Sequence, residues 1–235
     1  MGGAAGPKLV TKGLVLALDA ADKRSYPGSG TTWFDLSGLA NNGTIQNANQ
    51  FNSAGYFEFD GNSQNTEATV ATIEVNTDLT EGNTVEQWFY ADQRQGNGNM
   101  PFTWWNVAWN NWFYNNYFGI NNSNSLVYGI DNADDILIGK YNQVVTYYPN
   151  NWSTSKDDAK IWINGVSQTL SQLNGSFSNK SLSTSQTCGI GGGYTSGGDN
   201  FNFDGRIART FIYSRELSTL EVNQNYNALK NRFGL

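Results

Sequence analysis

Short segments in which hydrophobic and polar residues alternate recur along the whole chain. Segments of this kind, about four to eight residues long, are typical of β-strands with one buried face. They are Leu14–Leu18, Tyr56–Phe59, Thr84–Tyr90, Val144–Tyr148, Lys160–Ile163 and Arg206–Tyr213. In Lys160–Ile163, Ile161 and Ile163 would face one side of a sheet and Trp162 the other. The pattern predicts an all-β protein with two packed layers.

Turn signals separate these segments. Asn or Asp followed by Gly occurs at Asn42-Gly43, Asp60-Gly61, Asn164-Gly165 and Asn174-Gly175. Both residue types tolerate the positive φ angles of tight hairpin turns. Since two apolar residues flank Asn164-Gly165 directly, we expect a two-residue hairpin over Ile163–Val166.

The pattern changes to a helical period near the C-terminus. Ser218 and Glu221 have the spacing of a capping box, and Gly234 is placed to end the helix. The apolar stripe consists of Val222, Tyr226, Leu229 and Phe233. We therefore predict a short helix over residues 218–233. A helix of this length is unstable alone, so it must pack on the sandwich or on a neighbouring subunit.

Composition limits the possible partners. The 235 residues carry a net charge of −6, and no basic run is visible, which argues against a nucleic-acid surface. No apolar run approaches the roughly 20 residues that would span a membrane. The one cysteine, Cys188, cannot form an intrachain disulfide and is expected to be a small buried hydrophobe.

Both ends of the chain carry a recognisable series of motifs. The first end reads Gly13-Leu-Val-Leu-Ala-Leu-Asp19, Thr32-Trp33-Phe-Asp35-Leu-Ser-Gly38 and Asn41-Asn-Gly-Thr44, and the last reads Phe203-Asp-Gly-Arg206-Ile, Ile212-Tyr-Ser-Arg215-Glu-Leu-Ser218 and Asn225-Tyr-Asn-Ala-Leu. These motifs resemble the laminin-G-like, concanavalin A-like jelly rolls of structural proteins in tailed bacteriophages, particularly those of marine and cyanobacterial hosts. The resemblance runs nearly from end to end and implies a two-sheet antiparallel jelly-roll sandwich.

The resemblance also implies a role. We expect an N-terminal arm over residues 1–13, followed by one laminin-G-like domain over residues 14–235. The implied function is a virion structural protein, a capsid decoration or tail appendage. Its expected partners are other virion proteins, further copies of this chain and host glycans, with neither nucleic acid nor membrane among them. Residues 1–13 lack a secretion signal, so we expect synthesis in the host cytoplasm and a final location in the virion. The alternative function is a stand-alone carbohydrate-binding lectin.

Several enzyme classes are excluded by the absence of histidine. Without it the chain cannot build a Ser-His-Asp triad or a His-ligated metal site. A laminarinase-like glycoside hydrolase would need two carboxylates that converge on one sugar bond. The nearest acids, Glu74, Asp78, Glu81 and Glu86, do not alternate along one strand, and we expect Glu86 on the solvent face. The sequence therefore predicts a protein that is not an enzyme.

Aromatic residues are densest between Phe102 and Phe118, where they alternate with asparagines. Aromatic faces stack on sugar rings, and amides hydrogen-bond to hydroxyls. The same residue types also suit a protein interface or a hydrophobic core. The candidate residues for glycan or subunit contact are Trp104, Trp105, Trp109, Trp112, Tyr114 and Tyr117. All three interpretations stay open at this point.

An acidic segment is the candidate for a metal site. Asp131, Asp134 and Asp135 could supply oxygen ligands to calcium, an ion that laminin-G-like domains often bind. The chain departs from the family where Phe59-Asp60-Gly61 runs on into Asn62 instead of a further aspartate. The competing interpretation is a solvated acidic loop that binds no metal. Calcium is the one cofactor that the sequence suggests.

Overall fold

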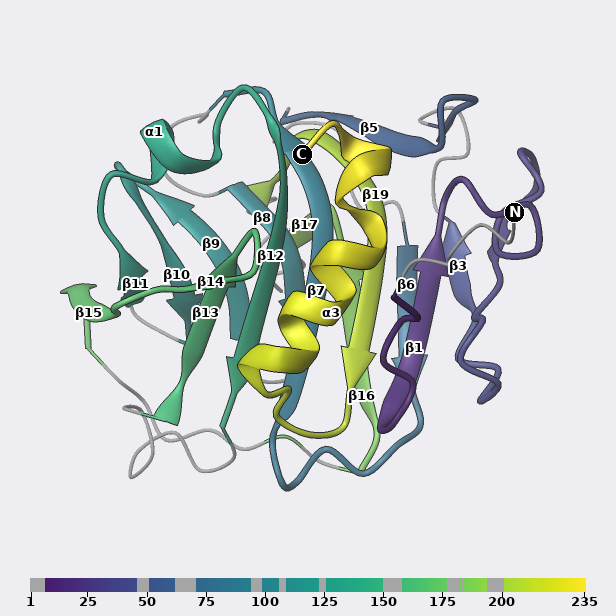
Figure 1. The fold of residues 1–235 in the computed structure, drawn as a ribbon, viewed down its shortest axis with the longest axis horizontal. Coiled ribbons are helices and arrows are strands. Elements are labelled where there is room, and N and C mark those ends of the chain that lie inside the picture. The colour runs from purple at the N-terminus through teal and green to yellow at the C-terminus, as the bar shows by residue number, and fades with distance from the viewer. Residues whose placement is uncertain are drawn as a thin grey trace, which may run out of the picture.

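The computed structural model describes residues 7–45, 51–61, 71–93, 99–105, 109–122, 126–149, 158–176, 182, 184–193 and 201–235. In these residues two antiparallel β-sheets pack face to face, and a helix near the C-terminus lies on the outside of the sandwich (Figure 1). The predicted all-β jelly-roll sandwich with a short C-terminal helix is confirmed.

The first sheet has eight strands among the described residues. Their order is β14 (Val166–Ser167), β13 (Lys160–Ile163), β12 (Tyr141–Tyr148), β7 (Asn83–Ala91), β19 (Asp204–Tyr213), β5 (Tyr56–Asp60) and β4 (Phe51–Asn52), with β1 (Leu14–Asp19) also paired to β19. One side of β19 pairs with β7 along its length. Its other side pairs first with β5 and then, beyond a register shift, with β1. The strands expected from the alternating pattern all lie in this eight-stranded sheet.

The second sheet has nine strands among the described residues. Their order is β15 (Ser171–Asn174), β11 (Val127–Ile130), β10 (Tyr117–Asn121), β9 (Trp109–Tyr114), β8 (Asn99–Trp104), β16 (Gln186–Ile190), β6 (Ala71–Val75), β3 (Gly43–Ile45) and β2 (Thr32–Trp33). A small ribbon joins β17 (Gly192–Gly193) to β18 (Phe201–Asn202). The strands β8 to β10 contain the aromatic segment, so this sheet positions the candidate site.

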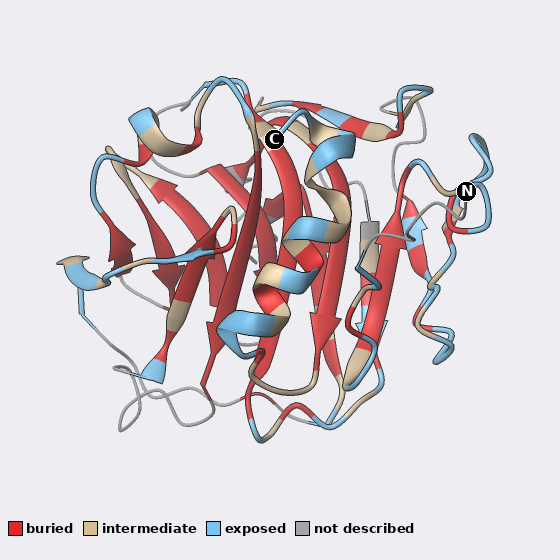
Figure 2. Ribbon diagram, viewed as in Figure 1, coloured by how far each residue is buried: buried red, intermediate tan, exposed pale blue. Residues whose placement is uncertain are grey.

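The core lies between the two sheets, where strands are buried along most of their length (Figure 2). Two polar contacts cross it. The Tyr148 hydroxyl donates to Asn111 Oδ1 at 2.6 Å, and Gln87 Nε2 donates to the Pro101 carbonyl at 3.1 Å. Because a buried polar group is costly without its partner, these contacts help to fix how one sheet sits on the other. Cys188 is buried here as predicted, and burial raises the pKa of its thiol.

The β13–β14 hairpin forms as the sequence predicts. Ile163 pairs with Val166, and Asn164 and Gly165 both have positive φ angles, 51° and 81°. This is the type of two-residue turn that matches the twist of its strands. Along β13 the side chains divide as expected, since Ile161 and Ile163 enter the core between the sheets and Trp162 lies on the outer face.

The C-terminal helix α3 (Thr219–Leu229) continues into a 3₁₀ turn, η3 (Lys230–Phe233). Ser218 and Glu221 form the predicted capping box, and Gly234 ends the turn with a φ of 73°. The helix lies across the outer face of the eight-stranded sheet (Figure 1). Its buried side chains are Val222 and Asn225. An asparagine, which the apolar pattern did not indicate, is therefore fully buried at the centre of this contact.

Asn225 faces a carboxylate, and here the prediction for Glu86 was wrong. Glu86 is 1% exposed and lies under α3. Its Oε2 accepts from Asn225 Nδ2 at 2.7 Å, while Oε1 accepts from Trp88 Nε1 and Gln143 Nε2, both at 3.0 Å. A buried carboxylate needs such donors because it has lost its hydration. No local pattern in the chain indicated that the helix would cover this strand position.

Residues 8–13, which were expected to form part of an N-terminal arm, lie against the same helix; residues 1–6 are outside the described part of the chain. The Val10 amide donates to Asn225 Oδ1 at 2.8 Å, and the Val10 carbonyl accepts from the Tyr213 hydroxyl at 3.2 Å. Gln224 Nε2 donates to the Lys8 carbonyl at 2.5 Å. Asn225 thus connects the first described residues, the helix and the sheet.

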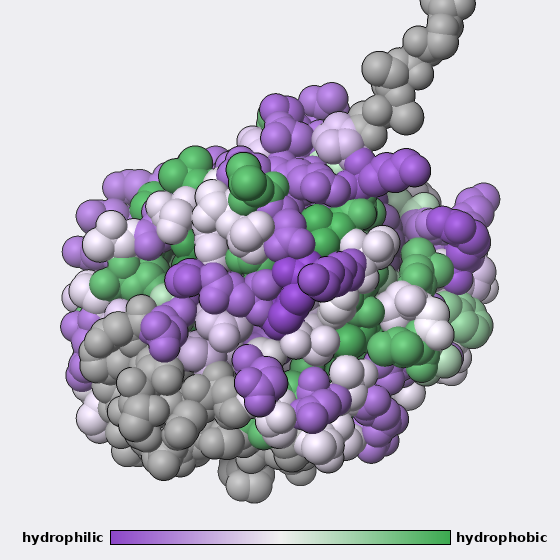
Figure 3. Space-filling view, turned by 60° about the horizontal axis from the view of Figure 1, so that its bottom comes forward, coloured by the Kyte–Doolittle hydropathy of each residue, from purple (hydrophilic) through white to green (hydrophobic). Residues whose placement is uncertain are grey.

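The surface shown in Figure 3 is mostly hydrophilic, with smaller hydrophobic areas between the polar residues. The large hydrophobic side chains that are exposed in the described residues are Phe34, Leu36, Leu39, Val166, Leu220 and Leu235. No helix within the described ranges has the length and apolar character needed to cross a membrane.

We predict that Asn225→Ala destabilises the protein. The change leaves the Val10 amide and a Glu86 oxygen without their buried partner, and the expected loss is about 2–4 kcal/mol of unfolding free energy. Urea denaturation measures this quantity. Asn227→Ala on the exposed side of the same helix is the control and should change stability by less than about 0.5 kcal/mol. Equal effects of the two changes would contradict the role assigned to Asn225.

A second prediction concerns acid stability. The Arg215 guanidinium, which donates to Glu221 at 2.6 and 2.9 Å, lowers the pKa of Glu221 to about 2, and the Ser218 groups assist it. Because the folded pKa is below the unfolded one, this stabilisation is complete above about pH 5 and is lost as the pH falls toward about 2. Glu221→Gln should remove this part of the acid dependence, about 1 kcal/mol after allowance for solvent screening.

The measurement is the free energy of unfolding of both proteins at pH values between about 5 and 2. Glu81→Gln, at an exposed position before β7, provides the control and should follow the unmodified protein. A Glu221→Gln protein that loses stability as steeply as the unmodified one would show that the pair with Arg215 contributes nothing.

Candidate functional site

The aromatic segment forms strands β8, β9 and β10 at the centre of the nine-stranded sheet. Successive side chains on a strand point to opposite faces, so the segment divides between the core and the outer face. Trp104 and Trp109 point inward and are both 0% exposed, and Trp109 stacks on Tyr148 with ring centroids 5.9 Å apart. These two residues must be removed from the predicted contact set, because an enclosed ring cannot touch a glycan or a second subunit.

The other four predicted residues lie on the outer face. Trp112 packs with Met100 and Val127, and the partly buried rings of Tyr114 and Tyr117 pack against this cluster. The ring centroids of Trp112 and Tyr114 are 4.8 Å apart. Trp112 itself is only 5% exposed, whereas Trp105, directly after the end of β8, is partly exposed. The structure therefore brings Trp112, Tyr114 and Tyr117 together and places Trp105 separately from them.

A row of polar side chains crosses this outer face. The Thr103 hydroxyl donates to Asn110 Oδ1, Asn110 Nδ2 donates to Asn121 Oδ1 at 3.2 Å, and Asn121 Nδ2 donates to the Leu126 carbonyl at 2.9 Å. We call Thr103, Asn110 and Asn121 the amide row. Its members come from β8, β9 and β10 in turn. The hydrogen bonds orient both amides, and the three side chains are only 2–6% exposed, so the row is a fixed and largely buried set of polar groups.

Glycines on neighbouring strands make room for the rings. Gly119 pairs with both Trp112 and Gly129 across β9, β10 and β11. A Cβ at Gly129 would lie 2.1 Å from the Phe118 carbonyl oxygen, so the backbones approach too closely for a side chain. A Cβ at Gly189 would lie 2.5 Å from Trp105 Nε1, which shows that this indole covers β16. Rings thus lie on both sides of the amide row.

Two of the acids considered for hydrolysis, Glu74 and Glu86, do not converge. Glu74 points outward from β6, between the core residues Ile73 and Val75, and it is the one carboxylate among the described strand residues of the nine-stranded sheet. Glu86 lies on the opposite outer face of the sandwich, under α3. Asp78 accepts from the Thr80 amide and hydroxyl within the turn before β7. The core separates Glu74 from Glu86, so these two cannot act on one bond.

The acidic segment is a short helix rather than a loop. Asp134 and Asp135 occupy the first turn of α1 (Ala133–Leu137), and Asp131 precedes it, accepting from the Asn132 amide at 2.7 Å. Asn116 Oδ1 accepts from the Asp134 amide at 3.0 Å and thereby fixes the start of α1 to the β9–β10 turn. Among the described residues no group of three Asp, Glu, Cys or His side chains is arranged to hold a metal ion. The geometry gives the calcium hypothesis no support.

The sequence analysis did not single out the amide row or the glycines beside it. Alternation within Trp109–Tyr114 contained the signal, because it puts Asn110, Trp112 and Tyr114 on one face. The sequence alone could not show which residues of β8 and β10 lie beside them. The pairing of β8 with β9 contains an irregularity between Asn99 and Phe102, and such a shift in register cannot be read from the alternating pattern.

No family model matches the chain, and no curated protein shows significant similarity to it. Solved structures do resemble it. A Trypanosoma rangeli sialidase in complex with 2,3-difluorosialic acid matches 97% of this chain with a TM-score of 0.63 and 12% sequence identity. Botulinum neurotoxin type C, whose cell entry depends on interaction with two ganglioside molecules, matches 94% with a TM-score of 0.55 and 15% identity. The binding domain of botulinum neurotoxin serotype D matches 92% with a TM-score of 0.56 and 14% identity.

These similarities establish the fold alone, because the identities are very low. The chain spans 35% of the sialidase chain and 52% of each neurotoxin chain. It is a β-sandwich of the kind found within these larger proteins.

Proposed function

We propose that this protein is a non-catalytic, carbohydrate-binding β-sandwich displayed on the surface of a tailed-bacteriophage virion. The observation that carries the binding role is the outer face of the nine-stranded sheet, where the partly exposed rings of Trp105, Tyr114 and Tyr117 lie around the largely buried amide row. The amides are oriented by their own hydrogen bonds, so little freedom would be lost when a ligand binds.

The chemistry of this face matches that of a neutral sugar. A pyranose has C–H faces that stack on aromatic rings and hydroxyls that both donate and accept hydrogen bonds. Asparagine side chains also do both, and threonine adds a hydroxyl. The fold is compatible with this role, since similar sandwiches occur in a sialidase solved with a sialic acid derivative and in a neurotoxin that interacts with gangliosides.

Two features support a role without catalysis. The chain has no histidine, so it lacks the usual general base of hydrolases that use a serine or cysteine nucleophile. A retaining or inverting glycosidase needs two carboxylates that flank one bond, whereas Glu74 and Glu86, two of the acids considered for this role, lie on opposite outer faces of the sandwich. Glu74 and Glu86 therefore cannot serve as the pair of a laminarinase-like activity.

The virion location is supported by the motifs at both ends of the chain. Residues 13–44 and 203–229 resemble the jelly rolls of tailed-phage structural proteins. The strands that contain them meet in the structure, because β1 pairs with β19. A display role needs one surface that attaches to the particle and another that faces outward, and a sandwich with two outer faces provides both.

We predict that Trp105→Ala weakens binding to a glycan array by about tenfold or more, because the indole beside the amide row would no longer stack on the sugar. Phe34→Ala is the control. Phe34 is 43% exposed and follows β2 at the edge of the sheet. It is far from the amide row, because β16, β6 and β3 lie between β2 and β8. Unchanged binding by the Trp105→Ala protein would exclude this face as the sugar site, and sugar release by the unmodified protein would contradict the non-catalytic role.

A separate measurement tests the location. Gold-labelled antibody against the purified chain should mark intact tailed-phage particles that encode it, at the capsid or the tail. Absence of the chain from purified particles, together with retained glycan binding, would favour the stand-alone lectin.

A further inference from the structure

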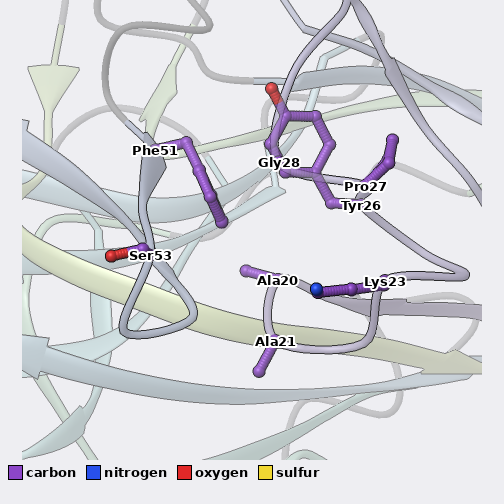
Figure 4. A pocket seen from close by; sticks show the side chains of 8 residues that line it. All are labelled: Ala20, Ala21, Lys23, Tyr26, Pro27, Gly28, Phe51 and Ser53. Atoms are coloured by element: carbon purple, nitrogen blue, oxygen red, sulfur yellow. The ribbon is translucent and has the colours of Figure 1, made fainter.

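A pocket of about 320 Å³ lies at one edge of the sandwich, away from the amide row. One wall is the connection between β1 and β2. The other is β4, the last strand of the eight-stranded sheet, with the turn that follows it. The lining residues are Ala20, Ala21, Lys23, Tyr26, Pro27, Gly28, Phe51 and Ser53 (Figure 4). This volume is at the lower end of the range of sites for small organic ligands.

Two aromatic rings form the apolar part of the pocket. Tyr26 is 1% exposed as a whole, its ring contacts Phe51 and Phe57 with centroids 4.8 and 5.1 Å away, and its hydroxyl donates to the Gly30 carbonyl at 3.1 Å. Phe51 projects into the pocket from the opposite wall (Figure 4). The rings are held by the core behind them, so the pocket has a rigid apolar side.

The β1–β2 connection is held just as firmly. The Ser25 hydroxyl donates to the Phe34 carbonyl at 2.7 Å and accepts from the Asp19 amide at 3.1 Å. Gly55 lies so close to Ala21 that a Cβ there would be 2.4 Å from the Ala21 Cβ. Lys23 therefore extends from a fixed segment of backbone.

Lys23 is the charged group of the pocket. Figure 4 shows its amino group directed in among the lining residues. The neighbouring charges are already paired, since Asp22 binds Arg24 at 2.6 Å and Asp19 accepts from Arg232 at 2.8 and 2.9 Å. In the described part of the chain, Lys23 has neither an ion pair nor a side-chain hydrogen bond. In a protein of net charge −6, an unpaired cation beside two aromatic rings is suited to an anionic ligand.

We propose that this pocket binds a saccharide unit that carries a carboxylate, as a second site beside the neutral sugar face. The ring of such a sugar would pack on the partly exposed Phe51, which the buried Tyr26 ring supports from behind, and its carboxylate would accept a charge-assisted hydrogen bond from Lys23 Nζ. This inference extends the proposed carbohydrate-binding function from neutral to acidic sugars. Two sites of different chemistry on one chain would also increase avidity for a mixed polysaccharide.

The test is an NMR titration of the full chain with sodium D-glucuronate, D-glucose and sodium acetate as separate probes. Glucuronate should shift the resonances around Tyr26 and Phe51 and bind more tightly than glucose or acetate, because only it offers both the ring and the carboxylate. Lys23→Gln should weaken glucuronate binding by about tenfold and leave glucose unaffected. Phe51→Leu should weaken both sugars, since the stacking surface is lost.

Lys12→Gln, an exposed lysine outside the pocket, is the matched control and should bind glucuronate as the unmodified chain does. Lys23 is exposed, so its replacement should leave the fold intact, which the same spectra report. Acetate binding as tightly as glucuronate, or a Lys23→Gln protein with full glucuronate affinity, would overturn the proposal.

Trp105→Ala separates this inference from the proposed function. It should reduce neutral glycan binding and leave the glucuronate titration unchanged. If neutral glycans fail to bind at all and glucuronate still shifts the pocket, the sugar face is wrong and the pocket stands. If Trp105→Ala abolishes both, the pocket is not a separate site.

Discussion

The contact between Glu86 and Asn225 determines how the two outer faces of the sandwich are used. A buried carboxylate must receive hydrogen bonds, and Asn225 supplies one while also binding the Val10 amide. The C-terminal helix and residues 8–13 are thereby held on the outer face of the eight-stranded sheet (Figure 1). The face with the amide row belongs to the other sheet, on the far side of the core.

The two candidate surfaces use the sandwich differently. The sugar face depends on strand alternation, since every second residue of β9 points outward and the pairing of β8, β9 and β10 aligns Thr103, Asn110 and Asn121. The edge pocket instead depends on a connection that returns to the core through Tyr26 and on Phe51, the first residue of the edge strand β4. One surface is neutral and the other has a free cation. A sandwich core makes both rigid, which lowers the entropic cost of binding.

Local signals in the sequence were sufficient for much of the fold. The Asn164-Gly165 hairpin and the Ser218–Glu221 capping box form as predicted, because each depends on residues that are close in the chain. The predicted contact residues divide between the core and the outer face of the sheet. Composition could locate the aromatic segment, but Trp104 and Trp109 turned out to be core residues, while Trp105 and Trp112 lie on the outer face of the sheet, Trp112 with only 5% of its surface exposed. Residues along a strand alternate between its two faces, and the packing of the other sheet decides which of the two alternating sets faces the core.

The sequence by itself therefore determined the fold class, the positions of the main strands, the tightest turn and the limits of the C-terminal helix, since propensity, period and capping act over a few residues. Only the tertiary structure decided that Glu86 is buried, that polar residues from β8, β9 and β10 form one row, and that Lys23 shares a pocket with Phe51. Each of these depends on contacts between residues that are far apart in the chain. Their formation follows from how the sheets and the helix pack, which no local pattern records.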